Sequence, residues 1–135
     1  MTNLSTFIIV LSLLILPLWS QPSAVTVHND LEELAYSFKN GSSKELSHYF
    51  GSRVEINISG NSGIYSRNQA EQVMRDFFRK YPPQDFNLLN RSAGSQDITA
   101  NMGHYFSLDQ RFKILIKARS EKDAFTIFAL DIIKD

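Results

Sequence analysis

The first hydrophobic positions after the opening segment follow the spacing of a helix. In the stretch HNDLEELAYSFKNGSS, apolar residues recur at positions i, i+3, i+4 and i+7, and the pair Asn40-Gly41 marks the end of the pattern. Ser42 and Glu45 then have the spacing of a capping box, ahead of apolar residues that share one helical face. The spacing therefore predicts one helix of about three turns and a second, shorter one.

The pattern then changes to alternation. In RVEINISG, apolar and polar residues alternate, which is typical of a strand with one buried face, and residues 60–63 predict a turn. Ser66 and Gln69 again have capping-box spacing, and apolar residues follow on one side of a helix. That helix must end at Tyr81-Pro82-Pro83, because the residue before a proline is disfavoured in a helix. A long helix is therefore predicted between the first strand and those that follow.

The last part of the chain predicts four strands joined by short polar connections. Their sequences are FNLLNRS, DITANMGHYFS, RFKILIKARS and AFTIFALDII. Connections of this length favour hairpins, hence antiparallel neighbours. The predicted fold class is α+β, with a curved antiparallel sheet of about five strands wrapped on the long helix and two helices at the N-terminal end.

The opening segment differs in composition from the rest. A short polar stub precedes a nearly unbroken apolar run over residues 7–19, which is shorter than the ~20 residues of a comfortable membrane span. We predict a Sec-type signal peptide at residues 1–20, followed by one domain at residues 21–135, and hence a periplasmic or secreted protein that meets the membrane only during export. Cleavage is expected after Ser20 or Ala24, and the alternative is an uncleaved anchor.

Composition excludes some function classes. The 135 residues carry 14 Lys and Arg against 14 Asp and Glu, so the chain lacks the basic excess typical of a general nucleic-acid binder. There is no cysteine, which excludes disulfide and thiolate chemistry. The three histidines have no metal-ligand spacing, and we predict neither a metal site nor a cofactor.

One stretch carries a family resemblance. The pattern Gly-x-x-Gly-x-Tyr-Ser-x-x-Gln-Ala-Glu, which begins at Gly60 and ends in Phe77-Phe78, is followed by MGHYF, FKILIKAR and FALDI. Together they resemble a family of small exported bacterial proteins that carry a domain of unknown function within the nuclear transport factor 2-like superfamily. The resemblance implies a cone-shaped fold, in which a bent sheet wraps a helix and leaves an open pocket at the wide end. It brings no established catalytic residues.

The pocket implied by this resemblance has candidate lining residues. The aromatic residues on the predicted helical faces point toward the sheet, and a cone lined in this way would hold an apolar small molecule. The alternative is that these rings simply fill the core. The candidate pocket residues are Phe38, Tyr49, Phe50, Tyr65, Phe77, Phe78 and His104.

Acid–base catalysis is the enzymatic alternative. Isomerases and dehydratases of the same superfamily resemble this chain in fold and use a buried carboxylate or His together with Tyr donors. The sequence offers Tyr49, Tyr65 and Tyr105 as donors and Glu55, Asp97, His104 and Asp109 as bases. No pair is singled out by spacing, so no catalytic residue is predicted. Three functions stay open: a non-catalytic binding or accessory module, a small-molecule isomerase or dehydratase, and a scaffold for protein association.

The final strand predicts self-association. Strict alternation places Phe128, Leu130 and Ile132 on one face and Phe125, Ile127 and Ala129 on the other, so both faces are apolar. An apolar patch on the open face of a sheet is expected to be covered, and a two-fold homodimer covers it with one surface. The sequence therefore predicts a homodimer centred on Phe125, Ile127 and Ala129. The alternative is that the segment after the leader, or a loop, covers the patch.

Overall fold

The computed structural model describes residues 24–93, 97–121 and 124–135, and the predicted signal peptide lies outside them. Within these ranges three helices and six strands follow one another along the chain. Their bounds are α2 (Ala24–Asn40), α3 (Ser43–Ser47), β1 (Phe50–Ile58), β2 (Asn61–Ser66), α4 (Arg67–Lys80), β3 (Asp85–Ala93), β4 (Ile98–Ser107), β5 (Gln110–Glu121) and β6 (Ala124–Lys134). None of the helices described is long and apolar enough to cross a membrane.

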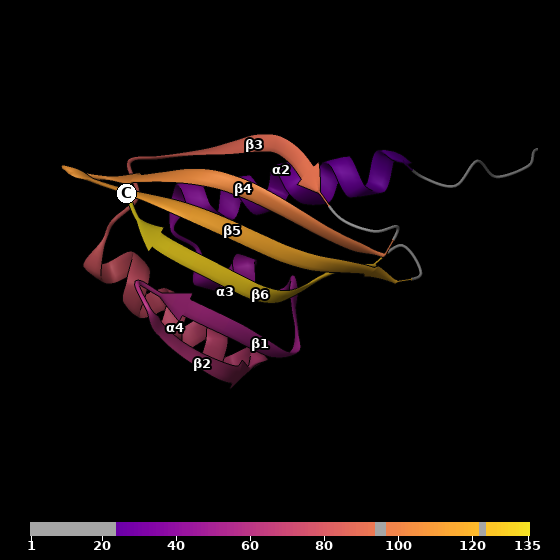
Figure 1. Cartoon of the computed structure of the whole chain (residues 1–135), viewed down its shortest axis with the longest axis horizontal. Helices are drawn as coiled ribbons and strands as arrows, with labels where there is room; N and C mark the ends of the chain where they lie inside the picture. The colour runs from indigo at the N-terminus through magenta and orange to yellow at the C-terminus, as the bar shows by residue number, and fades with distance from the viewer. Residues whose placement is uncertain (1–23, 94–96, 122–123) are drawn as a thin grey trace, which may run out of the picture.

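The strands form one mixed sheet in the order β2-β1-β6-β5-β4-β3. All neighbours are antiparallel except β1 and β6, which run parallel. The three helices lie behind the sheet in Figure 1, so one face of the sheet is covered and the other is open. The α+β class and the presence of two N-terminal helices are as predicted, although the first helix has 17 residues and is longer than the expected three turns. The sheet has six strands where about five were expected, and the pair β1 and β6 is parallel where all pairs were expected to be antiparallel.

The strand that the sequence did not predict is β2. Its sequence, NSGIYS, has no alternation of apolar and polar residues. Ser59 and Gly60 both have positive φ, 51° and 92°, which is the geometry of the two-residue turn that joins tightly paired strands. The chain therefore turns at residues 59–60, whereas the sequence predicted the turn at residues 60–63. Residues 61–63 already belong to β2, which pairs with β1 from Ile58 opposite Asn61 to Arg53 opposite Ser66.

The helix α4 begins and ends where the sequence predicts. The Ser66 hydroxyl accepts a hydrogen bond from the Gln69 amide at 3.3 Å, and the Gln69 side chain accepts one from the Ser66 amide at 3.0 Å. This reciprocal pair satisfies two amides that the first turn leaves without helical partners. The helix ends at Lys80, with Tyr81 as its C-cap ahead of the two prolines.

Aromatic rings fill the space between the helices and the covered face of the sheet. Phe38 of α2 is fully buried, stacks on Phe86 of β3 with ring centroids 4.8 Å apart, and meets Phe78 of α4 edge-on at 6.0 Å. Phe77 contacts the rings of Tyr105 and Phe112 at 5.3 and 5.4 Å. These contacts join α2, α4 and the three strands β3, β4 and β5 into one hydrophobic core.

A β-bulge changes the faces of β6. The register between β5 and β6 shifts between Lys117 and Ala118, whose partners are Ala129 and Ile127, so strict alternation fails at Phe128. Phe125 and Ile127 consequently lie on the covered face, 8% and 0% exposed, together with Leu130 and Ile132. The prediction that Phe125 and Ile127 lie on the open face is therefore wrong, although Ala129, opposite Lys117, does lie there. Whether the chain dimerises stays a prediction.

The phenol of Tyr105 gives the core a pH dependence. Tyr105 is fully buried and donates a hydrogen bond to the carbonyl of Tyr81, and burial raises the pKa of its phenol above the ordinary value of about 10. Above that pH the unfolded chain releases this proton while the folded chain keeps it. Stability is therefore expected to be full below about pH 10 and to fall as the pH rises further.

We expect Tyr105→Phe to reduce this alkaline loss of stability. At neutral pH the same variant should cost about 1–2 kcal/mol, because the Tyr81 carbonyl loses its donor. Urea unfolding at neutral pH and at several pH values above 10 measures both effects. Tyr36→Phe, at a position 61% exposed, is the control. An alkaline slope that is the same in Tyr105→Phe and in the unsubstituted protein would contradict the assignment.

Candidate functional site

A groove of about 410 Å³ opens between the β1–β2 hairpin and α4. It lies at the edge of the sheet where β2 is the last strand (Figure 1). Its lining combines apolar side chains with a few polar ones. The lining residues are Ile56, Ile58, Ser59, Asn61, Tyr65, Val73, Asp76, Phe77, Lys80 and Tyr81.

The apolar floor comes from two elements with different periods. Ile56 and Ile58 are two residues apart on β1 and therefore share its covered face. Val73 and Phe77 are one turn apart on α4 and share the helical face that packs against β1. The alternation of β1 and the helical spacing of α4 thus place four apolar side chains on the two walls of one groove.

Tyr65 forms the β2 side of the groove because Gly63 leaves room for its ring. A Cβ at position 63 would lie 2.5 Å from the Tyr65 Oη and 2.6 Å from its Cζ. Both residues lie on the same face of β2, and the ring rests over the glycine. Any side chain at Gly63 would displace the ring, so this glycine fixes the shape of the groove wall.

The rim of the groove carries charges that are open to solvent. Asp76 is paired with Arg79 at 3.7 Å, and its side chain is 73% exposed. The Lys80 ammonium lies 5.4 Å from the centre of the Tyr81 ring. Exposed charges of this kind are screened by water and add little binding energy, so the floor determines what the groove accepts. An apolar floor with a polar rim is suited to the apolar part of a small molecule.

A second hollow, of about 370 Å³, lies between α2 and α3 and is acidic. Its lining residues are Glu32, Glu33, Tyr36, Glu45, His48 and Tyr49. The Tyr49 hydroxyl donates a 2.7 Å hydrogen bond to Glu33, and burial, this bond and the nearby carboxylates raise the pKa of its phenol. Burial and the Glu33 carboxylate also raise the pKa of Asp30. Among the residues described, no group of three or more His, Asp or Glu side chains is arranged to hold a metal ion.

The structure separates the pocket residues expected from the sequence. Tyr65 and Phe77 line the groove at the hairpin, and Tyr49 lines the acidic hollow. Phe38, Phe50 and Phe78 belong to the hydrophobic core. His104 lies on the open face, since the side chain of its neighbour Tyr105 points into the core and His104 pairs with Lys113. The seven residues therefore do not form one pocket.

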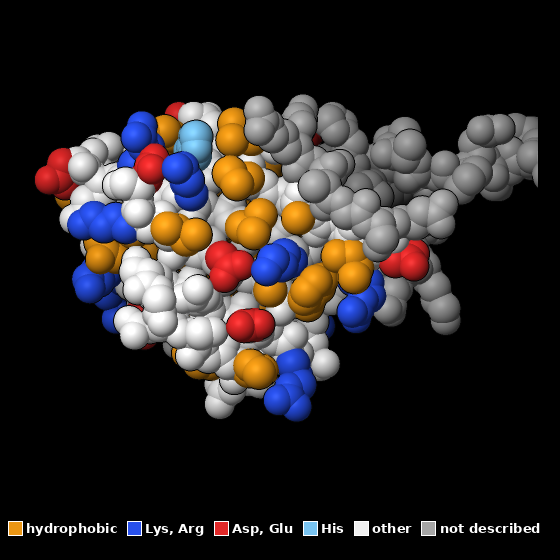
Figure 2. All heavy atoms as spheres, viewed as in Figure 1, with side chains coloured by type: hydrophobic (Ala, Val, Ile, Leu, Met, Phe, Trp, Pro, Cys, Tyr) orange, Lys and Arg blue, Asp and Glu red, His pale blue; other side chains and the backbone are white. Residues whose placement is uncertain are grey.

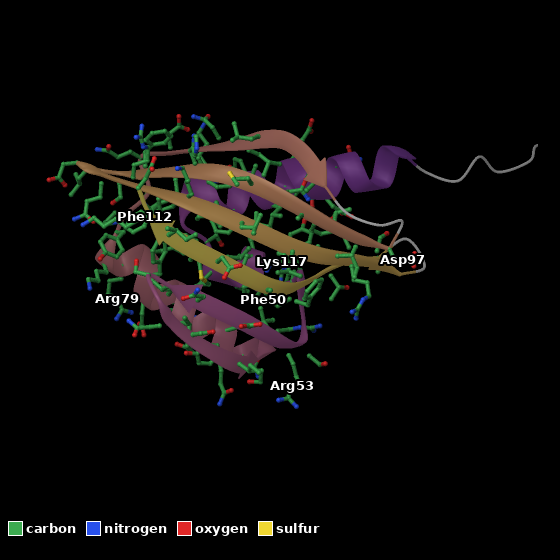
Figure 3. The ribbon with its side chains drawn as sticks, viewed as in Figure 1. Phe50, Arg53, Arg79, Asp97, Phe112 and Lys117 are labelled. Carbon is green, nitrogen blue, oxygen red and sulfur yellow. The ribbon has the colours of Figure 1, made fainter. Side chains whose placement is uncertain are left out.

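The candidate bases also lie away from the groove floor. Glu55 is exposed on the open face of β1 and accepts a hydrogen bond from Ser62 at 3.3 Å. Asp97 is exposed in the turn just before β4, and Asp109 is exposed in the turn between β4 and β5. Figure 3 shows Asp97 at the opposite end of the molecule from Arg79, which follows the groove residue Asp76 on α4.

Several groove residues were not singled out as site residues. The alternation of β1 and the helical face of α4 did mark Ile56, Ile58 and Val73 as inward-facing, so a signal for the floor existed. Asp76 and Lys80 carry no such signal, because only the position of the unpredicted strand β2 brings their helical face to a groove.

Comparison with known proteins places the whole domain in one family. Residues 31–132 match the model of the domain of unknown function DUF4783. A crystal structure of a DUF4783 family protein from Bacteroides ovatus is 25% identical, with a TM-score of 0.71 over 76% of this chain and 93% of that one. A DUF4783 family protein from Bacteroides fragilis is 27% identical, with a TM-score of 0.70 over 76% and 96%.

A more distant likeness shows the fold alone. An NTF-2 like protein of unknown function from Silicibacter pomeroyi is 12% identical, with a TM-score of 0.58 over 82% of this chain and 93% of that one. No curated protein matches the sequence. The similar proteins therefore establish the family and the fold without supplying an activity.

Proposed function

Because the chain belongs to the DUF4783 family, whose function is unknown, the family supplies no activity. From the groove, we propose that the protein is an exported, non-catalytic binding module for an apolar small molecule. The observation that carries this proposal is the apolar floor between β1 and α4. The volume of about 410 Å³ is within the range of small-molecule sites, roughly 300–1,000 Å³.

The groups around the groove support binding more than catalysis. General acid–base chemistry needs a group whose pKa is shifted by burial or by a fixed partner. The acid on this rim, Asp76, is largely exposed and paired with Arg79. The side chains that would orient a ligand are the Tyr65 and Tyr81 phenols and Lys80, which are donors rather than bases. No observation favours an isomerase or a dehydratase over this binding role.

We expect the dye 1-anilinonaphthalene-8-sulfonate, which joins apolar aromatic rings to one charged sulfonate, to bind with its rings in this groove. Val73→Trp places a large ring in the groove that Val73 lines and should weaken dye binding about tenfold, the effect of losing roughly 1.4 kcal/mol of contact. A fluorescence titration measures the affinity, and circular dichroism verifies that the variant folds. Ile133→Trp, which adds the same ring on the open face, is the matched control. Equal affinity of the two variants would place the dye elsewhere.

Export remains part of the proposal. The apolar run of residues 7–19 supports it, since it is followed by small residues suited to signal-peptide cleavage. Intact mass measurement of the protein recovered from its own host identifies the first residue. A mature chain that still begins at Met1 would contradict the prediction of a cleaved signal peptide.

We also propose a homodimer through the open face of the sheet, with a revised centre. Met102 lies between Leu89 of β3 and Leu115 of β5 in the register, and these half-buried side chains form an apolar row across three strands. Phe128 continues the apolar surface on β6, where Arg119 lies 5.4 Å from its ring. Figure 2 shows hydrophobic side chains spread over this face among charged ones. A second copy would cover the row by two-fold symmetry.

Met102→Lys combined with Leu115→Lys is expected to convert this dimer to a monomer. Both side chains extend from the open face, so a lysine at each position would place like charges across the two-fold axis. Sedimentation velocity at micromolar concentration measures the change, and Ile64→Lys, on the edge strand, is the control. A monomeric parent protein, or a dimer that persists in the double variant, would contradict the open-face interface.

A further inference from the structure

The strand β2 is a free edge of the sheet. Among the residues described it pairs with β1 and with no other strand, since it is the first in the order β2-β1-β6-β5-β4-β3. A strand paired on one side leaves every second amide and carbonyl directed outward from the sheet. The amide of Ser66, the last residue of β2, already donates to the Gln69 side chain, so the outward row lies in the part of β2 before it. Figure 1 shows β2 at the border of the molecule, with α4 behind it.

This edge lacks the features that protect sheet edges from pairing. Proteins usually block an edge with charged residues, proline or a bulge. The six residues of β2 include no charged residue and no proline, and their register with β1 runs without a shift from Ile58 opposite Asn61 to Arg53 opposite Ser66. Its sequence also presents Ile64, 63% exposed, on the face away from α4.

The other edge of the sheet is protected. The strand β3 begins with Asp85, which forms a 3.5 Å ion pair with Lys39 of α2. Its register with β4 shifts between Leu89 and Ala93, which interrupts a regular row of outward groups. The two edges of this sheet therefore differ, since β3 carries protective features that β2 lacks.

The free edge lies beside the groove at the hairpin. Asn61 and Tyr65 of β2 line that groove together with Val73 and Asp76 of α4. The side chains of a strand added to β2 would alternate between the two faces of the sheet. One set would lie beside Tyr65 and the mouth of the groove, and the other set would lie beside Ile64.

We propose that the edge of β2 binds an extended segment of another polypeptide, which adds to the sheet as an antiparallel strand. A regular row of outward amides and carbonyls matches the backbone of another strand, and the adjacent groove accepts its alternate apolar side chains. A second copy of β2 fits less well, because its groove-facing positions are Asn61, Gly63 and Tyr65, only one of them apolar. This inference does not rest on the groove holding a small molecule.

The probe is a synthetic peptide with the sequence RVEINI, acetylated and amidated. This is the segment of β1, residues 53–58, that already pairs with β2 on its other side, and it alternates apolar and polar residues. Two further peptides have the same side chains but carry backbone N-methyl groups. The first is N-methylated at the valine and both isoleucines, and the second is N-methylated at the glutamate and the asparagine. An added strand directs only one of these two sets of amides at β2.

Binding is followed by amide NMR spectra of the full-length mature protein and by isothermal titration. We expect the unmodified peptide to bind and to protect the outward amides of β2 from hydrogen exchange. One N-methylated peptide should lose about tenfold or more in affinity, because it loses hydrogen bonds to the edge, while the other should bind like the parent peptide.

Three outcomes would overturn the proposal. One is the absence of binding up to millimolar peptide, and another is an equal loss or equal retention of affinity in the two N-methylated peptides. The third is a dimer in sedimentation that the parent peptide dissociates with changes at the β2 amides, which would make a second copy the occupant of this edge.

Discussion

Phe38→Ala is expected to lower the free energy of unfolding by about 3–5 kcal/mol, the cost of removing a large aromatic side chain from a well-packed core. Phe38 is fully buried, and it connects α2 to the rest of the molecule through its stacked contact with Phe86 and its edge contact with Phe78. The alanine would leave a cavity that these rings can fill only in part, since each also packs on other core residues.

Urea unfolding monitored by circular dichroism measures this loss. Tyr36→Ala removes an aromatic side chain of similar size from the same helix at a position that is 61% exposed, and it should change stability by well under about 1 kcal/mol. The comparison also separates two interpretations of Phe38. A small loss of stability together with weaker dye binding would assign Phe38 to a ligand cavity and contradict its assignment to the core.

Gly103→Ala is expected to destabilise the protein by about 2–3 kcal/mol, although it adds only one methyl group. A Cβ at this position would lie 2.2 Å from the Phe86 Cζ and 2.5 Å from its Cε2, far inside van der Waals contact. The Phe86 ring cannot move away freely, because it is itself stacked on Phe38. The glycine is required here by the close approach of a ring to the backbone of β4.

A double-mutant cycle tests this cause. If the clash with the ring is responsible, Phe86→Leu combined with Gly103→Ala should be less destabilised than the sum of the two single variants, with a coupling of about 1 kcal/mol or more. Gly51→Ala is the control, because its nearest neighbour, the Thr126 Cγ2, lies 3.2 Å away at the end of a side chain. Strict additivity in the cycle would mean that Phe86 is not the obstacle.

Local patterns predicted the helices and most strands correctly. The reciprocal hydrogen bonds at Ser66 and Gln69 are made by neighbours in sequence, so their spacing alone was sufficient to predict them. The strand β2 was not predictable in this way. Its pairing depends on the positive φ of Ser59 and on β1 as a template, and a mostly exposed edge strand has little need of alternation.

The candidate site was less predictable than the fold. The helical faces correctly marked Phe38, Phe77 and Phe78 as inward-facing, but a periodicity does not say whether an inward ring meets another ring or an open space. The bulge at Phe128 had the same effect on the interface, because one extra residue in β6 reversed the faces of Phe125 and Ile127. Both errors arose at steps that only tertiary packing decides.

The parallel pairing of β1 with β6 constrains the order in which this chain folds. Asn57 and Asp131, whose side chains are hydrogen-bonded across that pair, are 74 residues apart in sequence. The hairpin β1–β2 is complete early in synthesis, yet within the sheet it joins the β3–β5 meander only through the last strand. Because such distant contacts require a large loop to close, the pairing of β1 with β6 must form late. A chain that ends before β6 therefore retains two hydrophobic surfaces with no strand between them.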